Sequence, residues 1–218
     1  AFLAPPGLCV TLLSPDGAGK TLLLHNLSRQ MKSYFGSVTT FHWRPGLLPE
    51  LGVLFKKRKP NMAPVENPHE KPPHGRILSL VRLIYYILDY YFGWLIKVWP
   101  AQSKNHLIIF DRYSYDMAID PRRYRFHLPD LLLFYLVRFV PRPNIIVLLS
   151  GDAEVILDRK REIDYEDLKN ILKRFEELIT NNPSIIKIDC KLEPELICEI
   201  VTRNIEDVQT SRLKANRK

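Results

Sequence analysis

The segment 14–21, which reads SPDGAGKT, constrains the fold of this chain more than any other. It follows a short apolar run at 8–13 and precedes a helical pattern from Lys20 to about Tyr34. A strand, a glycine-rich turn and a helix in this order are typical of a phosphate-binding loop with the pattern G-x-x-x-x-G-K-[ST]. The chain departs from this pattern only at the first glycine, where Ser14 stands.

We expect this loop to bind the phosphates of a nucleoside triphosphate. The N–H groups of residues 16–21 can wrap a phosphate, and the N-terminus of the following helix adds a favourable dipole. Lys20 would reach the β- and γ-phosphates, and Thr21 would hold Mg²⁺. The nucleotide-binding residues expected from this loop are Ser14, Asp16, Gly17, Ala18, Gly19, Lys20, Thr21 and Leu22.

Strand-like and helix-like segments alternate along the rest of the chain. The expected strands cover 8–13, 38–43, 107–110, 144–149 and 185–189, and the expected helices cover 20–34, 129–139, 152–161, 164–180 and 193–208. This alternation predicts a parallel sheet with helices on both faces. We therefore expect an α/β chain with a three-layer P-loop NTPase fold, in which a five-stranded parallel sheet is flanked by helices in one domain at 8–208.

Three segments stand apart from this alternation. Residues 44–75 carry seven prolines and a basic run at 56–59, so they cannot form a regular element. They are expected to form a long surface loop that is mobile or folds over a ligand. Residues 155–165 are expected to form a lid-like segment, and 209–218 a frayed basic tail.

The segment 76–103 is the most apolar part of the chain, but charged residues interrupt it at Arg82, Asp89 and Lys97. Each charge would cost roughly 2.5–3.5 kcal/mol at the centre of a bilayer, so we do not expect a membrane span. At 100° per residue, the polar and small side chains share one stripe. We expect a largely buried helix whose stripe borders the active cleft, with a solvated stripe as the alternative. The stripe contains Ser79, Arg82, Tyr86, Asp89, Gly93 and Lys97.

The composition, with 46% hydrophobic and 26% charged residues, is that of a folded globular protein. The net charge of +8 favours an anionic partner or reflects a lysine-rich solvated surface. No motif of interleaved aromatic and basic residues supports nucleic-acid binding, whereas peripheral membrane association and a homodimer remain open.

Three cysteines without a CxxC pair indicate reduced core thiols, no zinc site and a cytoplasmic setting. Residues 1–8 are too short for a signal peptide.

The sequence Asp111-Arg112-Tyr113 stands at the carboxyl end of the third expected strand. In open α/β sheets, ligands bind outside the carboxyl ends of the strands. A carboxylate at this place can order Mg²⁺ or accept a proton from an attacking hydroxyl, and Arg112 can clamp an acceptor phosphate. An ion pair that caps the strand is the alternative interpretation.

Two further clusters are rich in arginine: Asp158–Glu162 and Asp120–Arg125. Phosphoryl transfer develops charge on the transferring group, and arginines delivered by a closing loop offset that charge. Either cluster could supply such an arginine. Solvated surface charge is the alternative for each.

These motifs come in the order and spacing of thymidylate kinases, which the chain resembles from about residue 8 to 208. The matching features are SPDGAGKT at 14–21, Arg44-Pro45, FDRY at 110–113, the stretch 148–161 and Phe175-Glu176. More closely, the chain looks like thymidylate kinase-like proteins of bacterial surface-polysaccharide gene clusters. These share HWRPGLLP at 42–49 and DPRRY at 120–124.

The resemblance implies ATP and Mg²⁺ as cofactors and a phosphorylated small molecule as acceptor. It implies Mg²⁺ ligation by Thr21 and Asp111. Because the P-loop has no arginine, a catalytic arginine would have to come from the lid. The implied catalytic residues are Lys20, Asp111, Arg112, Arg159 and Arg161. The acceptor-binding residues expected from the resemblance and from the stripe are Asp16, Arg44, Arg82, Tyr86, Asp89, Arg112, Tyr113, Arg122 and Arg123.

The chain departs from thymidylate kinases on the acceptor side. Tyr90 occupies the place of a substrate-gripping arginine, and 118–125 replaces a segment that contains Gly-Gly. Phosphorylation of dTMP is therefore in doubt. Three functions remain open: a nucleoside monophosphate kinase, a kinase of a sugar or lipid-linked saccharide in surface-polysaccharide synthesis, and a nucleotide-binding module without turnover. Retention of Lys20, Thr21 and Asp111 argues against the last.

Overall fold

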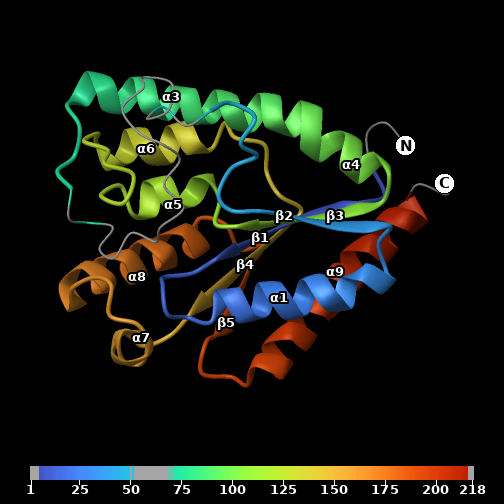
Figure 1. Cartoon of the computed structure of the whole chain (residues 1–218). Coiled ribbons are helices and arrows are strands. Elements are labelled where there is room, and N and C mark those ends of the chain that lie inside the picture. The colour runs from blue at the N-terminus through green and yellow to red at the C-terminus, as the bar shows by residue number, and fades with distance from the viewer. Residues whose placement is uncertain (1–4, 50, 52–68, 70, 216–218) are drawn as a thin grey trace.

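A parallel sheet forms the centre of the computed structural model, which describes residues 5–49, 51, 69 and 71–215. The strand order within this described part is β2-β3-β1-β4-β5 (Figure 1). All four neighbouring pairs are parallel, which confirms the predicted five-stranded parallel sheet. The strands are β1 (Leu8–Leu13), β2 (Ser37–Phe41), β3 (His106–Asp111), β4 (Ile145–Ser150) and β5 (Ile185–Asp189).

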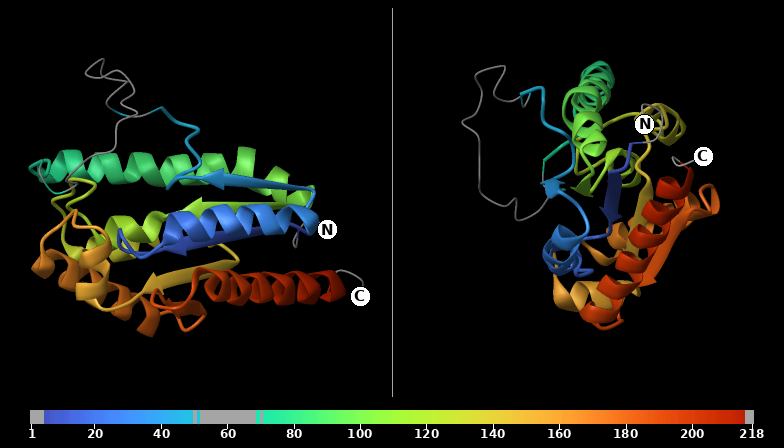
Figure 2. Two further views of the ribbon diagram at one scale, coloured as in Figure 1. Left: turned by 60° about the horizontal axis from the view of Figure 1, so that its bottom comes forward. Right: turned by 90° about the vertical axis from the view of Figure 1, so that its right-hand side faces the viewer.

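Helices cover both faces of the sheet, as the three-layer prediction required. In Figure 1, α1 and α9 lie below the sheet and α3, α5 and α6 above it, and the turned views in Figure 2 agree. The helical segments are α1 (Lys20–Gln30), η1 (Met31–Ser33), α3 (Arg76–Gly93), η2 (Trp94–Val98), α4 (Trp99–Ser103), α5 (Ser114–Ile119), α6 (Asp130–Val137), α7 (Ala153–Arg159), α8 (Tyr165–Thr180) and α9 (Pro194–Ala215).

Strand β1 is buried along its whole length because it contributes to two cores. Cys9 and Leu13 join the core that includes α3, α5 and α6. Leu8, Val10 and Leu12 join the core that includes α1 and α9. Successive side chains of a strand point to opposite faces, so a strand covered on both sides is apolar at nearly every position. This explains the apolar run in the sequence, which only Thr11 interrupts.

The ends of the chain differ from the prediction. Helix α9 continues to Ala215 instead of stopping near 208, so the predicted frayed tail is wrong for residues 209–215. Arg212 Nη1 donates to the carbonyl oxygens of Pro5 and Gly7 at 3.4 Å each, which ties this last turn to the start of β1. Residues 216–218 and the basic run at 56–59 lie outside the described residues.

Helix α3 has its polar stripe turned inward, and its apolar side faces outward. Ser79 and Asp89 of the stripe have no exposed surface, whereas Ile77 on the opposite side is 83% exposed. The expectation of a largely buried helix is therefore wrong, and so is that of a solvated stripe. The exposed apolar residues of α3 and η2 are Ile77, Leu78, Val81, Ile84, Leu88, Tyr91, Phe92, Leu95 and Ile96. Within the described part of the chain, no helix is long and apolar enough to cross a bilayer.

The inward stripe of α3 binds the turn that follows β2. Asp89 Oδ2 accepts hydrogen bonds from Arg44 Nη1 at 2.9 Å and from the Gly46 N–H at 3.1 Å. Asp89 Oδ1 accepts one from the Leu48 N–H at 2.5 Å. Farther along, Lys97 Nζ donates to the carbonyl of Gly46 at 3.1 Å. A buried carboxylate needs such partners, so the turn determines which side of α3 is buried.

Replacing Asp89 with Ala is expected to destabilise the fold by about 3–5 kcal/mol, because it leaves the buried Arg44 guanidinium without its charge partner. Urea unfolding followed by circular dichroism measures this change. The control is Asp130→Ala, because Asp130 is half-exposed and pairs with Arg174 at the surface. That variant should lose less than about 1 kcal/mol. Equal losses in the two variants would contradict the assignment of Asp89 as the anchor of the turn.

Candidate active site

The loop between β1 and α1 has the backbone of a phosphate-binding turn. Gly17 and Gly19 have φ angles of 93° and 92°, in the left-handed region that favours glycine. A Cβ on Gly17 would lie 2.8 Å from the carbonyl oxygen of Ile156 in α7. Gly17 is therefore required both by its φ angle and by the close packing of α7. This packing brings the beginning of the lid-like segment against the loop.

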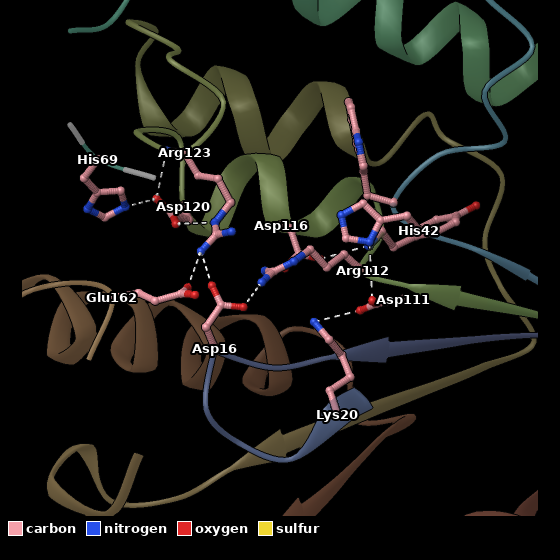
Figure 3. A network of polar contacts seen from close by, with 12 residues as sticks. Asp16, Lys20, His42, His69, Asp111, Arg112, Asp116, Asp120, Arg123 and Glu162 are labelled. Atoms are coloured by element: carbon pink, nitrogen blue, oxygen red, sulfur yellow. Dashed lines mark hydrogen bonds and ion pairs between the residues drawn. The ribbon is translucent and has the colours of Figure 1, made fainter. Parts of the chain in front are cut away.

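Lys20, the first residue of α1, points at the end of β3 (Figure 3). Its Nζ lies 2.9 Å from Asp111 Oδ1. Lys20 Nζ and Asp111 Oδ1 are ion-paired with each other but, like the buried Ser14 Oγ, have no further hydrogen-bond partner among the described residues. Such buried polar atoms are costly unless a ligand satisfies them, so they fit a phosphate and a metal ion bound here.

The environment of Asp111 keeps its carboxyl ionised. Burial favours the neutral form, but the hydrogen bond from His42 and the charge of Lys20 lower the pKa of Asp111 to about 2. His42 Nδ1 lies 3.3 Å from Asp111 Oδ2 but is largely exposed, so solvent screens its effect on Asp111 more than that of the buried Lys20. Burial and the charge of Arg112 lower the pKa of Lys20. An ionised carboxylate at this position can order Mg²⁺.

Arg112 extends from the end of β3 toward the phosphate-binding loop. It is almost fully buried and has a φ of 77°, an unusual backbone conformation for a residue with a side chain. Its guanidinium contacts the Asp16 carboxylate through Nη2 and Asp116 Oδ1 through Nη1 at 3.3 Å. Asp116 Oδ2 also accepts the N–H of Tyr113 at 2.9 Å. Arg112 is thus fixed between the loop and α5.

Asp16 also binds a second guanidinium, that of Arg123. Burial opposes ionisation of Asp16, but the charges of Arg112 and Arg123 hold its pKa well below the usual range. Arg123 Nε donates to Asp120 Oδ2 at 3.2 Å, and Arg123 Nη2 lies 4.0 Å from Glu162 Oε2 in the lid-like segment. Two arginines from different elements therefore converge on one carboxylate of the loop (Figure 3).

His69 joins the long loop to the rest of this network. Its Nε2 lies 2.8 Å from Asp120 Oδ1, and its Nδ1 lies 3.0 Å from Asp167 Oδ2. Burial favours the neutral ring, but the two carboxylates raise the pKa of His69. Arg122 Nη1 contacts both oxygens of Asp167 at 2.8 Å and is therefore bound to α8. A cavity of about 230 Å³ adjoins His69 and Arg122 at this outer end of the network.

Among the described residues, neither arginine of the lid-like segment forms a hydrogen bond or ion pair with the phosphate-binding loop. Arg159 Nη1 donates to the carbonyl of Cys190 at 2.9 Å, beyond β5. Arg161 is exposed. Lys160 Nζ pairs with Glu162 Oε1 at 2.6 Å. Besides Arg112, the arginine that contacts Asp16 is Arg123, from the other predicted cluster.

Several predicted acceptor residues lie among the aromatic side chains that pack along α3, a group that we call the wall. Arg44 is held by Asp89, and Arg82 Nη2 donates to the Tyr86 hydroxyl at 2.8 Å with its guanidinium 5.5 Å from the centre of that ring. Tyr113 is fully buried, and its hydroxyl donates to the Pro141 carbonyl at 2.5 Å. Arg44, Arg82 and Tyr113 thus direct their hydrogen bonds to Asp89, Tyr86 and Pro141.

Tyr90, which stands in place of the expected arginine, is also fully buried. Its hydroxyl contacts the carbonyl of Trp43, and its ring packs against Tyr113 at a centroid distance of 4.9 Å. A side chain with these contacts supports the packing of α3 against the turn after β2.

The sequence did not single out His42, His69, Asp116 or Glu162 as site residues. Asp116 follows Arg112 at the i, i+4 spacing, which is informative only once α5 is known. Glu162 lies in the predicted arginine-rich cluster but was given no role of its own. His42 and His69 have no local signal, because their partners lie 69 and 51 residues away in sequence.

Comparison with known proteins identifies the fold. No protein-family model matches the sequence, and no curated protein matches it either. Among solved structures, the thymidylate kinase from Ehrlichia chaffeensis is similar with a TM-score of 0.62 at 19% sequence identity. The match covers 92% of this chain and 100% of that chain. The chain therefore has the fold of a thymidylate kinase, as the order of its motifs predicted.

The proton on His69 is expected to stabilise the fold at low pH. Because the pKa of His69 is raised in the folded chain, its contribution is complete below the usual histidine value of about 6.5 and is lost as the pH rises through the raised value. The free energy of urea unfolding, measured from about pH 5.5 to 9, should differ between wild type and His69→Gln most at low pH.

The matched control is His25→Gln, on the exposed side of α1. That variant should differ from wild type by a smaller and flatter amount over the same pH range. A gap between wild type and His69→Gln that stays constant or widens with rising pH would show that the carboxylate contacts of His69 do not carry a proton.

Proposed function

We propose that this protein is an ATP- and Mg²⁺-dependent phosphotransferase that resembles nucleoside monophosphate kinases. It transfers the γ-phosphate to a phosphorylated small acceptor. The observation that carries this proposal is the pairing of two sets of charges across the P-loop, Lys20 with Asp111 and Arg112 with Asp16. The first pair suits the donor nucleotide, and the second suits an anionic acceptor.

The donor half of the proposal rests on the P-loop and its surroundings. The loop backbone and Lys20 would bind the triphosphate, and Thr21 with Asp111 would hold Mg²⁺, whose charge offsets that of the phosphates. The buried atoms without hydrogen-bond partners, Lys20 Nζ and Asp111 Oδ1, support this assignment because a bound phosphate and metal ion would satisfy both. A binding module without turnover would not need the Lys20–Asp111 pair.

The acceptor half rests on the guanidinium groups around Asp16. Arginine forms charge-assisted and often bidentate hydrogen bonds with phosphate, so Arg112 is suited to hold a phosphate group of the acceptor. An incoming phosphate would bind N–H groups of Arg112 beside the one that contacts Asp16, so that Arg112 would bridge the acceptor and the carboxylate of the loop. The acceptor would thus place an anionic oxygen next to the P-loop.

The base-binding apparatus of a dTMP kinase is not supported here. Tyr90 is buried in the wall, and Arg82 is directed to the Tyr86 hydroxyl. This favours the second candidate function, in which the acceptor is a phosphorylated sugar or a lipid-linked saccharide. The resemblance to proteins of surface-polysaccharide gene clusters points the same way.

A cytoplasmic setting is consistent with the three free, buried cysteines.

Lys20→Ala is expected to abolish ADP release from ATP while leaving the fold intact, because the lysine binds phosphate and contributes little to either core. A coupled ADP-release assay with Mg²⁺ and a panel of nucleoside monophosphates and phosphorylated sugars measures turnover, and circular dichroism checks the fold. Lys32→Ala, on the exposed end of the same helical region, is the control. Turnover by Lys20→Ala at the wild-type level would refute the phosphotransferase proposal.

dTMP is expected to be a poor acceptor, because the place of the gripping arginine is taken by the buried Tyr90. In the same panel, kcat/KM for dTMP should fall at least about tenfold below that of the best acceptor, a difference of about 1.4 kcal/mol in transition-state stabilisation. If dTMP proves to be the best acceptor in the panel, the reassignment of the acceptor is wrong, whereas the donor half of the proposal stands.

A further inference from the structure

Arg123 is the second guanidinium at the P-loop, and it comes from the segment between α5 and α6. Its Nη2 contacts Asp16 Oδ2, one residue before Gly17 of the phosphate-binding turn. Because the N–H groups of this turn would surround a phosphate, a side chain seated on Asp16 lies beside the phosphate site. The Arg123 side chain is 24% exposed, so it borders the opening of the site as well as the network.

The position of Arg123 is set by Asp120. Asp120 Oδ1 accepts the backbone N–H of Arg123 at 3.2 Å, and Asp120 Oδ2 accepts its Nε–H at the same distance. Asp120 itself is anchored because its backbone N–H donates to the Asp116 carbonyl at 2.9 Å. His69 contacts the same carboxylate. The base of the Arg123 guanidinium is thus held in place, whereas its Nη2 end faces Asp16 and Glu162.

The arginines of the lid-like segment are placed less favourably. Arg159 is bound to the carbonyl of Cys190, and Arg161 is exposed. Glu162 of the same segment lies 4.0 Å from Arg123 Nη2 and forms a close ion pair with Lys160. The lid-like segment therefore brings a carboxylate toward Arg123, and Lys160 can neutralise that carboxylate when Arg123 leaves it.

We propose that Arg123 is a catalytic residue that moves its Nη2 group from Asp16 to the γ-phosphate of bound ATP and stays on the transferring phosphoryl group. This inference rests on the proposed phosphotransferase function and replaces the expectation that Arg159 or Arg161 supplies the catalytic arginine. Asp16 keeps Arg112 as its partner after the exchange. The Arg123 guanidinium exchanges one anionic partner, the Asp16 carboxylate, for another, the γ-phosphate, so no buried charge is left unpaired.

In the reaction, an ionised oxygen of the acceptor phosphate forms a bond to the γ-phosphorus. The bond from that phosphorus to the β–γ bridging oxygen breaks, and its electron pair stays on ADP. No proton has to move, because the attacking oxygen is already ionised. Arg123 donates hydrogen bonds to the non-bridging oxygens as they carry the developing charge, a contribution worth about 10³–10⁵ in kcat for arginines in this role.

The test compares Arg123→Gln, Arg123→Lys and Arg161→Gln in the full chain, with the exposed Arg138→Gln of the α6 end as control. Titration calorimetry gives the affinities for Mg·ADP and for the triphosphate analogue Mg·AMP-PNP. The ADP-release assay gives kcat with the acceptor that stimulates the wild type most. Thermal unfolding and the ADP affinity verify that each variant is folded.

We expect Arg123→Gln to bind ADP within about threefold of wild type, to bind AMP-PNP about tenfold more weakly, and to lose at least about a hundredfold in kcat. Arg123→Lys should fold and bind ADP normally but recover only part of both losses, because lysine lacks the planar fork of arginine. Arg161→Gln should lose less than Arg123→Gln on both measures. Arg138→Gln should match wild type.

Two results would overturn the inference: an ADP-to-AMP-PNP affinity ratio that is the same in Arg123→Gln and wild type, or a larger loss of kcat in Arg161→Gln than in Arg123→Gln. These outcomes differ from failure of the proposed function, in which the wild type itself releases no ADP with any acceptor. In that case the affinity ratio still decides whether Arg123 contacts the γ-phosphate.

Discussion

The parallel pairing of β1 with β3 is the constraint on which the candidate site depends. Leu12 of β1 is in register with Asp111 of β3, and the Arg112 N–H donates to the Leu12 carbonyl at 3.0 Å. Parallel strands end at the same edge of a sheet, so the loop after β1 and the sequence Asp111-Arg112 after β3 emerge side by side. The contacts of Lys20 with Asp111 and of Arg112 with Asp16 follow from this register.

The sequence predicted the features that depend on neighbours along the chain. The sheet and the glycine-rich turn are confirmed because apolar runs and glycines are local signals. Helix α5 was missed because six residues are too few for a helical period to show. The buried side of α3 was misjudged because it depends on contacts of Asp89 with a turn more than 40 residues away. The contact of Arg123 with Asp16 joins residues 107 positions apart, so no local sequence pattern predicts it.

The charges of the site compensate one another within the protein. Arg112 and Arg123 share Asp16, while Asp116 and Asp120 each bind one of these arginines on the other side. Buried charges are stable only when they are paired, and here each pair also fixes the direction of a guanidinium. A ligand with phosphate groups therefore meets donors that are already oriented, and it exchanges with a carboxylate instead of creating the arrangement.

The close approach of α7 to the P-loop determines where this part of the chain can bend. The space beside Gly17 is filled by the carbonyl of Ile156 and the Cβ of Lys160, so α7 packs directly against the loop. Rotation of α7 would drive backbone against backbone in a packed interior. We therefore expect any hinge of the lid-like segment to lie after Lys160, in the short connection to Tyr165. Glu162 lies inside that connection, so even a small swing there would separate its carboxylate from Arg123.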